Sequence, residues 1–133
     1  MPYNSLTHII HRENIHQIKM PKSTYERKLS NWVDRSYFVE DAQGQIYVKP
    51  GLILAQDTTS YKYVPYNSGA AYGTGSDTAV GVLDILLNLT LGEEDTSPIF
   101  HGSLIEAYCY FLGGADGAIS STIKTQLSDI NWV

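Results

Sequence analysis

The chain has 133 residues, a hydrophobic content of 43% and a formal net charge of −5. This length fits one domain with a single core. The longest apolar runs, such as residues 107–112, fall far short of the roughly 20 residues that a membrane-spanning helix needs. The N-terminus has no continuous apolar stretch of the kind found in secretory signals. We therefore expect a soluble globular protein that folds in a reducing cytoplasm.

Charge is divided unequally between the two parts of the chain. Residues 1–49 carry seven Lys or Arg against five acidic residues, whereas residues 50–133 carry two against nine. Such asymmetry indicates an interacting tail on an acidic body, with a chance division of one surface as the alternative. An acidic body argues against nucleic acid as the partner, because phosphate binding needs clustered Lys and Arg.

The first third of the chain predicts an arm followed by a short helix. Residues 1–22 show no sustained period, which favours an extended arm. A helix over residues 23–35 is predicted by a capping box at Ser23 and Glu26 and by apolar residues at helical spacing, namely Tyr25, Leu29, Trp32 and Val33. Residues 37–39 and 45–48 flank a turn at residues 41–44 and predict a hairpin.

The rest of the chain predicts mainly strands. Short strands are expected over residues 52–56 and 61–64, and longer ones over residues 80–91, bent near Asp84 or Asn88, and 103–112. A short helix over residues 117–127 would be capped by Asp116, with Ile119, Ile123 and Leu127 along one side. We divide the chain into an N-terminal arm at residues 1–44 and a β-rich domain at residues 45–133.

No stretch of the sequence predicts catalysis or cofactor binding. The glycine-rich residues 72–76 lack the lysine and the following helix of a phosphate-binding loop. His8, His11 and His16 have no cysteine partners and no clear carboxylate set for a metal site. Glu93 to Asp95 are typical of a solvated loop, and Cys109 of a small buried apolar residue. We expect no enzyme, no cofactor and no metal.

The middle of the chain contains a series of short motifs: a Gly-x-x-Leu strand at Gly51 and Leu54, a Tyr-Val-Pro-Tyr step, a loop rich in small residues, and a Thr-Ala-x-Gly-Val-Leu strand. In these motifs the chain resembles the small head decoration (cement) proteins of lambda-type tailed phages. The resemblance extends weakly to the C-terminus. The matching residues with an expected structural role are Gly51, Leu54, Tyr63, Pro65, Tyr66, Gly81 and Trp132.

This resemblance implies a compact β-rich decoration-protein fold that binds the outside of a phage head. It implies self-association into homotrimers at three-fold positions, with the major capsid protein as partner and neither nucleic acid nor membrane. Such a protein is made in the host cytoplasm and resides on the outer surface of the virion. The expected capsid-binding residues of the arm are Ile9, Ile10, Ile15, Ile18, Tyr25, Leu29 and Trp32.

A second reading starts from the ten tyrosines of the chain. Tyrosine is common in protein interfaces, where its large amphipathic ring is useful, and it is equally common in strands. A surface-displayed module that binds carbohydrate or a receptor is therefore the alternative to capsid decoration.

Overall fold

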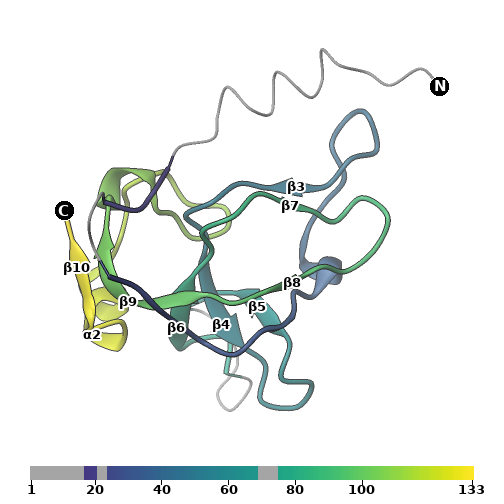
Figure 1. Ribbon diagram of the computed structural model, residues 1–133. Coiled ribbons are helices and arrows are strands. Elements are labelled where there is room, and N and C mark those ends of the chain that lie inside the picture. The colour runs from purple at the N-terminus through teal and green to yellow at the C-terminus, as the bar shows by residue number, and fades with distance from the viewer. Residues whose placement is uncertain (1–16, 21–23, 69–74) are drawn as a thin grey trace.

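The computed structural model describes residues 17–20, 24–68 and 75–133. Within these ranges the protein is mainly β, with one short α-helix near the C-terminus (Figure 1). The main sheet has the strand order β1-β9-β6-β4-β5, and β10 pairs with β9 in parallel. Its strands are β1 (Glu26–Arg27), β4 (Ile53–Gln56), β5 (Tyr63–Pro65), β6 (Ala79–Val82), β9 (Ile99–Leu104) and β10 (Ile130–Trp132).

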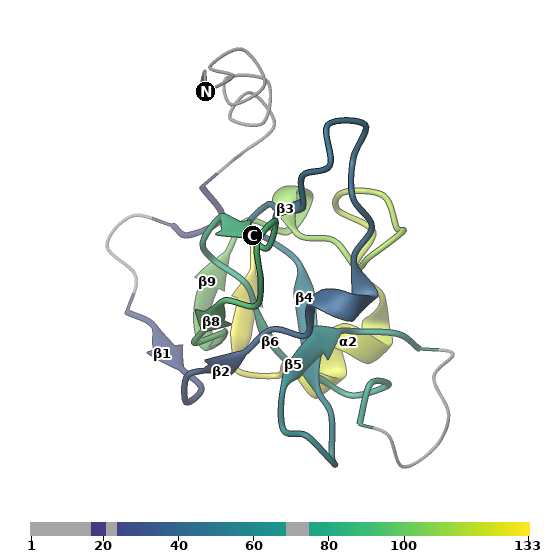
Figure 2. The same ribbon diagram turned by 90° about the vertical axis from the view of Figure 1, so that its right-hand side faces the viewer.

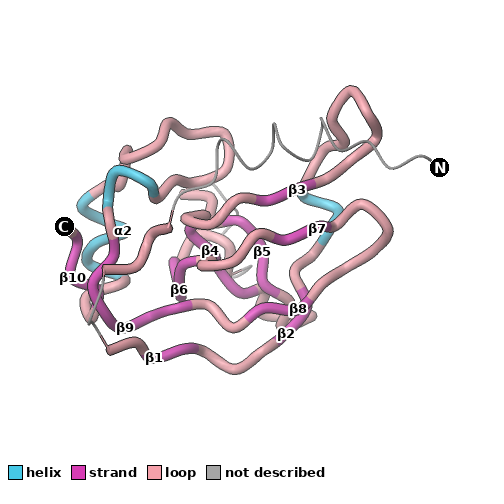
Figure 3. Tube along the Cα trace, turned by 45° about the horizontal axis from the view of Figure 1, so that its top comes forward, coloured by secondary structure: helices cyan, strands magenta, loops and turns pink. Residues whose placement is uncertain are grey.

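Two smaller antiparallel pairs accompany this sheet. β2 (Asn31–Trp32) pairs with β8 (Asp95–Thr96), and β3 (Tyr47–Val48) pairs with β7 (Leu87–Asn88), as Figure 3 shows. The helices are the 3-10 turns η1 (Arg35–Tyr37) and η2 (Glu106–Tyr108) and the helix α2 (Ser121–Gln126). Ser120 caps the N-terminus of α2, where its side chain accepts a hydrogen bond from the Ile123 N–H.

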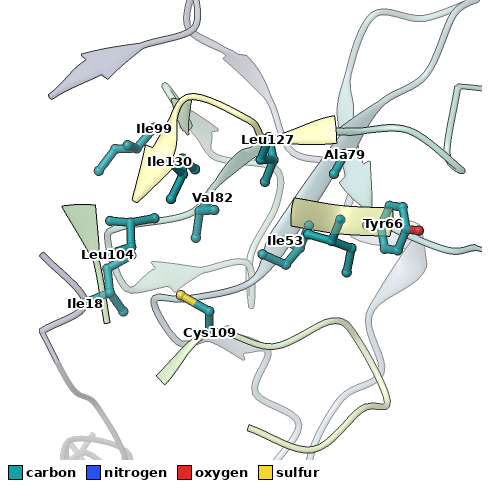
Figure 4. Packing of buried hydrophobic residues seen from close by; sticks show 11 residues of the cluster. Ile18, Ile53, Tyr66, Ala79, Val82, Ile99, Leu104, Cys109, Leu127 and Ile130 are labelled. Atoms are coloured by element: carbon teal, nitrogen blue, oxygen red, sulfur yellow. The ribbon is translucent and has the colours of Figure 1, made fainter. Parts of the chain in front are cut away.

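The core consists of two apolar clusters on opposite faces of β4. Because successive side chains of a strand point to opposite faces, Ile53 joins the first cluster while Leu52 and Leu54 join the second. β4 is therefore buried on both faces. Figure 4 shows the first cluster, whose members are Ile18, Ile53, Tyr66, Ala79, Val82, Ile99, Leu104, Cys109, Ile123, Leu127 and Ile130. The second contains Val33, Ile46, Val48, Leu52, Leu54, Tyr63, Leu83, Leu87, Leu89 and Tyr110.

The chain from β1 to Asp34 links the two ends of the main sheet. β1 pairs with β9 at one end, and β2 continues along β8 (Figure 2). Two residues later, the Asp34 N–H donates to the Tyr63 carbonyl at 2.9 Å, at the other end of the sheet. Val33 beside it is fully buried in the second cluster. This segment therefore joins the β9 side of the main sheet to the β5 side.

The helix predicted over residues 23–35 is wrong for residues 24–35, which contain β1 and β2 and reach only the first residue of η1. Ser23 lies outside the described residues. The predicted hairpin of residues 37–39 with residues 45–48 is also wrong, because β3, which lies within residues 45–48, pairs with β7. The turn between them is confirmed, since the Gly44 N–H donates to the Asp41 carbonyl at 3.0 Å.

The strands of the body follow the predicted pattern with shifted bounds. β4 and β5 are confirmed. The strand predicted over residues 80–91 is interrupted at residues 83–86, so the expected bend near Asp84 is a break between β6 and β7. The strand predicted over residues 103–112 starts earlier, as β9, and gives way to η2. The C-terminal helix is confirmed but shorter, and Ser120 caps it in place of Asp116.

Some of the described residues of the predicted arm are part of the packed body. Ile18 and Val33 are both core residues, and β1 and β2 pair with β9 and β8. Ile18 and Val33 thus pack against residues beyond residue 44, and the boundary predicted there stays a prediction. The role expected for residues 1–44 in capsid binding is a separate matter and stays a prediction.

Candidate interaction surface

The seven residues expected to contact a capsid lie in very different environments. Ile9, Ile10 and Ile15 fall outside the described residues. Ile18 is buried in the first cluster, with only 1% of its surface exposed, so it cannot contact a partner in this conformation. Tyr25 is half-buried, and its hydroxyl donates to the Ser103 carbonyl at 2.9 Å. That leaves Leu29 and Trp32, which are 89% and 51% exposed.

Trp32 shares an outward face with an acidic residue. It lies directly opposite Asp95 in the β2–β8 pair, so the two side chains project from the same side of the strands. The Ser30 hydroxyl donates to the Asp95 carboxylate at 2.8 Å. On either side of this pair, Val33 and Thr96 are buried. The alternation fixes Trp32 on the surface, which is where an interface anchor has to be.

The loop before β8 adds an exposed apolar residue that sequence reasoning missed. Leu91 is fully exposed, although it ends the apolar run that starts at β6. Arg35 holds this loop through hydrogen bonds to the carbonyls of Leu89 and Thr90, at 2.6 and 3.0 Å. The signal available in the sequence was the position of Leu91 immediately before the glycine and acids of residues 92–95.

Glu93, in the same loop, is tied to the body. The Lys62 ammonium donates to both of its carboxylate oxygens, at 2.8 and 3.0 Å. This hydrogen bonding, helped by the charge of Glu93, raises the pKa of Lys62. The surface around Trp32 is thus acidic and apolar, and its loop is held by Arg35 on one side and Lys62 on the other.

A second set of charges meets at Asp84, between β6 and β7. The Arg27 guanidinium donates to its two oxygens at 2.7 and 2.6 Å, and the Lys19 ammonium lies 3.5 Å away. The side chain of Asp84 is only 3% exposed. Burial alone would raise the pKa of Asp84, but Arg27 and Lys19 outweigh it and hold the pKa below its usual value.

The residues that carry the resemblance meet on three neighbouring strands. Leu54, in the middle of β4, is opposite Pro65 on β5 and opposite Gly81 on β6. Pro65 has no N–H to donate, which suits the last residue of a short strand. Tyr63 is buried beside them, and its hydroxyl donates to the Leu29 carbonyl at 2.6 Å.

The remaining motif residues also have structural positions. Gly51 has φ +106, and a Cβ there would overlap the Tyr108 carbonyl oxygen, so only glycine fits. Tyr66 is buried in the first cluster, and Trp132 is partly buried against it. The structural role expected for these residues stays a prediction.

The described residues contain no group of three or more His, Cys, Asp or Glu that could hold a metal ion. His8, His11 and His16 lie outside this part of the chain, as do residues 72–74 of the glycine-rich loop. Gly75 and Ser76 lead into β6 without an intervening helix. Cys109 is a free, buried thiol, and burial, helped by the charge of Glu106, raises its pKa to about 12. A thiol with that pKa is a poor nucleophile.

In the described ranges, no helix has the length and apolar character needed to cross a membrane. A scan of protein-family models and searches of curated proteins and of solved structures found nothing that matches this chain.

Proposed function

We propose that this protein is a structural capsid decoration protein. It binds the outer surface of a phage head through the major capsid protein, sits there as trimers at three-fold positions, and stabilises the head against internal DNA pressure. The proposal starts from the resemblance of residues 51–83 to head decoration proteins.

The observation that carries the proposal is the arrangement of those residues. Leu54, Pro65 and Gly81 are separated in the sequence, yet they are direct neighbours across three strands. The three strands follow one another in the chain, and the shared residues form one structural unit, the β5-β4-β6 part of the sheet.

The exposed surface supports a binding role without chemistry. Leu29, Trp32 and Leu91 are exposed on and near the β2–β8 pair. Tryptophan is frequent among the residues that dominate protein interfaces. The acidic neighbours Asp95 and Glu94 add charge that a basic capsid surface would complement.

The alternative, a carbohydrate- or receptor-binding module, depends on exposed tyrosines. In the part of the chain that the structure describes, Tyr63, Tyr66 and Tyr110 are buried, whereas Tyr37 and Tyr61 are exposed. Tyr61 is 62% exposed, with its carbonyl engaged by Asn31 and Gln56. Three of the eight described tyrosines are therefore core residues, and Tyr25 and Tyr108 pack against the first cluster, which favours the decoration role.

Co-sedimentation with phage heads tests the proposal. The heads come from the phage that encodes this chain, grown without its gene, and the purified protein is added back. We expect saturable binding, three-fold clusters by particle imaging, and retention of DNA at temperatures where bare heads release it. Heads that bind no protein, or that gain no resistance from it, would contradict the proposal.

A further inference from the structure

The segment from Glu26 to Trp32 lies on the body without burying any side chain. Six of its seven residues are exposed, and Asn31 is partly exposed. Its neighbours differ, because Tyr25 packs against the first cluster and Val33 is fully buried in the second. The segment is therefore held at both ends by apolar contacts and along its length by polar ones.

Backbone pairing accounts for part of this polar attachment. The Lys28 N–H donates to the Pro98 carbonyl at 2.8 Å, and β1 pairs with β9 with a register irregularity between Glu26 and Arg27. Exposed backbone hydrogen bonds of this kind, with no apolar burial beside them, are characteristic of regions that open locally. Backbone pairing alone would leave the segment weakly attached.

The Tyr63 hydroxyl donates to the Leu29 carbonyl and the Asn31 amide to the Tyr61 carbonyl, and Asp84 supplies the ion pair of the segment. The Asp84 carboxylate is almost completely buried, receives both ends of the Arg27 guanidinium, and comes from the break between β6 and β7. Arg27 also donates to the Ser97 carbonyl at 3.2 Å, which ties it to the turn before β9. Two-point pairing of Arg with a carboxylate is stronger than a neutral hydrogen bond and fixes geometry as well.

We propose that residues 26–32, which contain β1 and β2, open and close as a unit while the rest of the fold stays intact, and that the Arg27–Asp84 pair is the latch that keeps this unit closed. Tyr25 and Val33 are the fixed ends of this unit. When it opens, the outer edge of β9 loses its partner and the Pro98 carbonyl becomes free to accept another donor. The device is independent of whether the protein decorates capsids.

Hydrogen exchange on the full-length protein tests the latch at single amides. In Asp84→Asn, we expect the Lys28 amide to exchange about tenfold faster or more, because a hydrogen bond to a charged group is lost from the closed state only. The Ile53 amide, which donates to the Tyr110 carbonyl in the core, should keep its rate. Trypsin should also cleave faster after Arg27 or Lys28 in this variant.

Asp116→Asn is the matched control, because it removes the carboxylate of a surface ion pair with Lys49 at 3.0 Å and should leave the Lys28 amide unchanged. If Asp84→Asn does not fold, Arg27→Lys replaces it, since lysine keeps the charge and loses the two-point contact. The latch is overturned if the Lys28 amide exchanges at the wild-type rate in the folded variant. It is equally overturned if the Lys28 and Ile53 amides accelerate together, which would mean global unfolding.

Discussion

The ring of Tyr25 occupies the space that a side chain at residue 102 would need. Gly102 has φ +135, and a Cβ built on it would overlap the Cδ1 atom of Tyr25 and lie 2.7 Å from its Cε1 atom. The hydroxyl of Tyr25 lies within hydrogen-bond distance of two backbone carbonyls, that of Met20 at 3.0 Å and that of Ser103 at 2.9 Å. The N-terminal part of the chain is therefore fitted to β9 through a glycine.

Replacing this glycine should destabilise the protein. Gly102→Ala combines a backbone conformation that alanine avoids with displacement of Tyr25, and we expect a loss of about 2 kcal/mol or more in the free energy of unfolding. Urea denaturation measures it. Gly92→Ala is the control, because nothing lies within 4 Å of its Cβ position and its φ is ordinary. Equal stability of the two variants would contradict the fit between Tyr25 and Gly102.

Trp32→Ala separates the interface from the core. Because Trp32 is half exposed on the outer face of β2, its removal should change the free energy of unfolding by no more than about 0.5 kcal/mol. If the proposed capsid contact includes it, occupancy on phage heads should fall clearly. Val39→Ala, at a residue that is 90% exposed and outside the β2–β8 pair, is the control. Normal occupancy with a destabilised free protein would argue that Trp32 serves the fold.

Truncation distinguishes the parts of the N-terminal region. A chain beginning at Gln45 lacks the buried residues Ile18 and Val33. Removing a large buried side chain lowers the free energy of unfolding by about 2–5 kcal/mol, and removing a valine lowers it somewhat less. We expect such a chain to be unfolded by circular dichroism. A chain beginning at Gln17 keeps both residues and should fold.

The same two chains test the arm as a capsid anchor. If Ile9, Ile10 and Ile15 contact the capsid, the folded chain beginning at Gln17 should lose most of its occupancy on heads. Full occupancy would restrict the anchor to the described part of the chain. A stable chain beginning at Gln45 would instead contradict the packing of Ile18 and Val33.

We expect the folded protein to lose stability in alkaline solution because of Cys109. Its pKa is raised from 9.0 to about 12, so the folded state holds the thiol proton over a range in which the unfolded state has lost it. This contribution is fully present below pH 9.0 and is lost as the pH rises toward about 12, by about 1.4 kcal/mol per pH unit.

The measurement is urea denaturation from pH 8 upward to about pH 11, comparing the protein with Cys109→Ala. Subtraction removes the contributions of other groups, such as the tyrosines with raised pKa values. The variant should lose stability less steeply with pH than the wild type. Identical slopes would mean that the thiol titrates normally in the folded state.

Sequence patterns predicted those elements whose burial is decided locally. The run around Leu54 and the step at Pro65 gave the correct strands, because apolar residues between turn signals form buried strands in most contexts. The pattern of Tyr25, Leu29, Trp32 and Val33 misled, since it fits a helix equally well. Its actual conformation is decided by partners far along the chain, in β8 and β9.

The candidate surface was predictable in part for the same reason. Trp32 was expected at an interface and is exposed, although from a strand and not from a helix. Ile18 was expected at the interface and is buried, because it packs in the first cluster beside Leu104 of β9, and no local pattern reveals the position of that strand. No local sequence pattern around Arg27 or around Asp84 indicates that these two residues form an ion pair.

The segment from β1 to Asp34 links the two ends of the main sheet. This arrangement affects the order in which the chain is made and folded. Arg27 pairs with Ile99, and Lys19 bridges to Leu104, so these residues leave the ribosome long before their partners exist. Contacts of such large sequence separation form late and slow folding. β1 is therefore made before β9 but can be placed only after it, and a β9 strand that still lacks β1 exposes an unpaired edge to neighbouring chains.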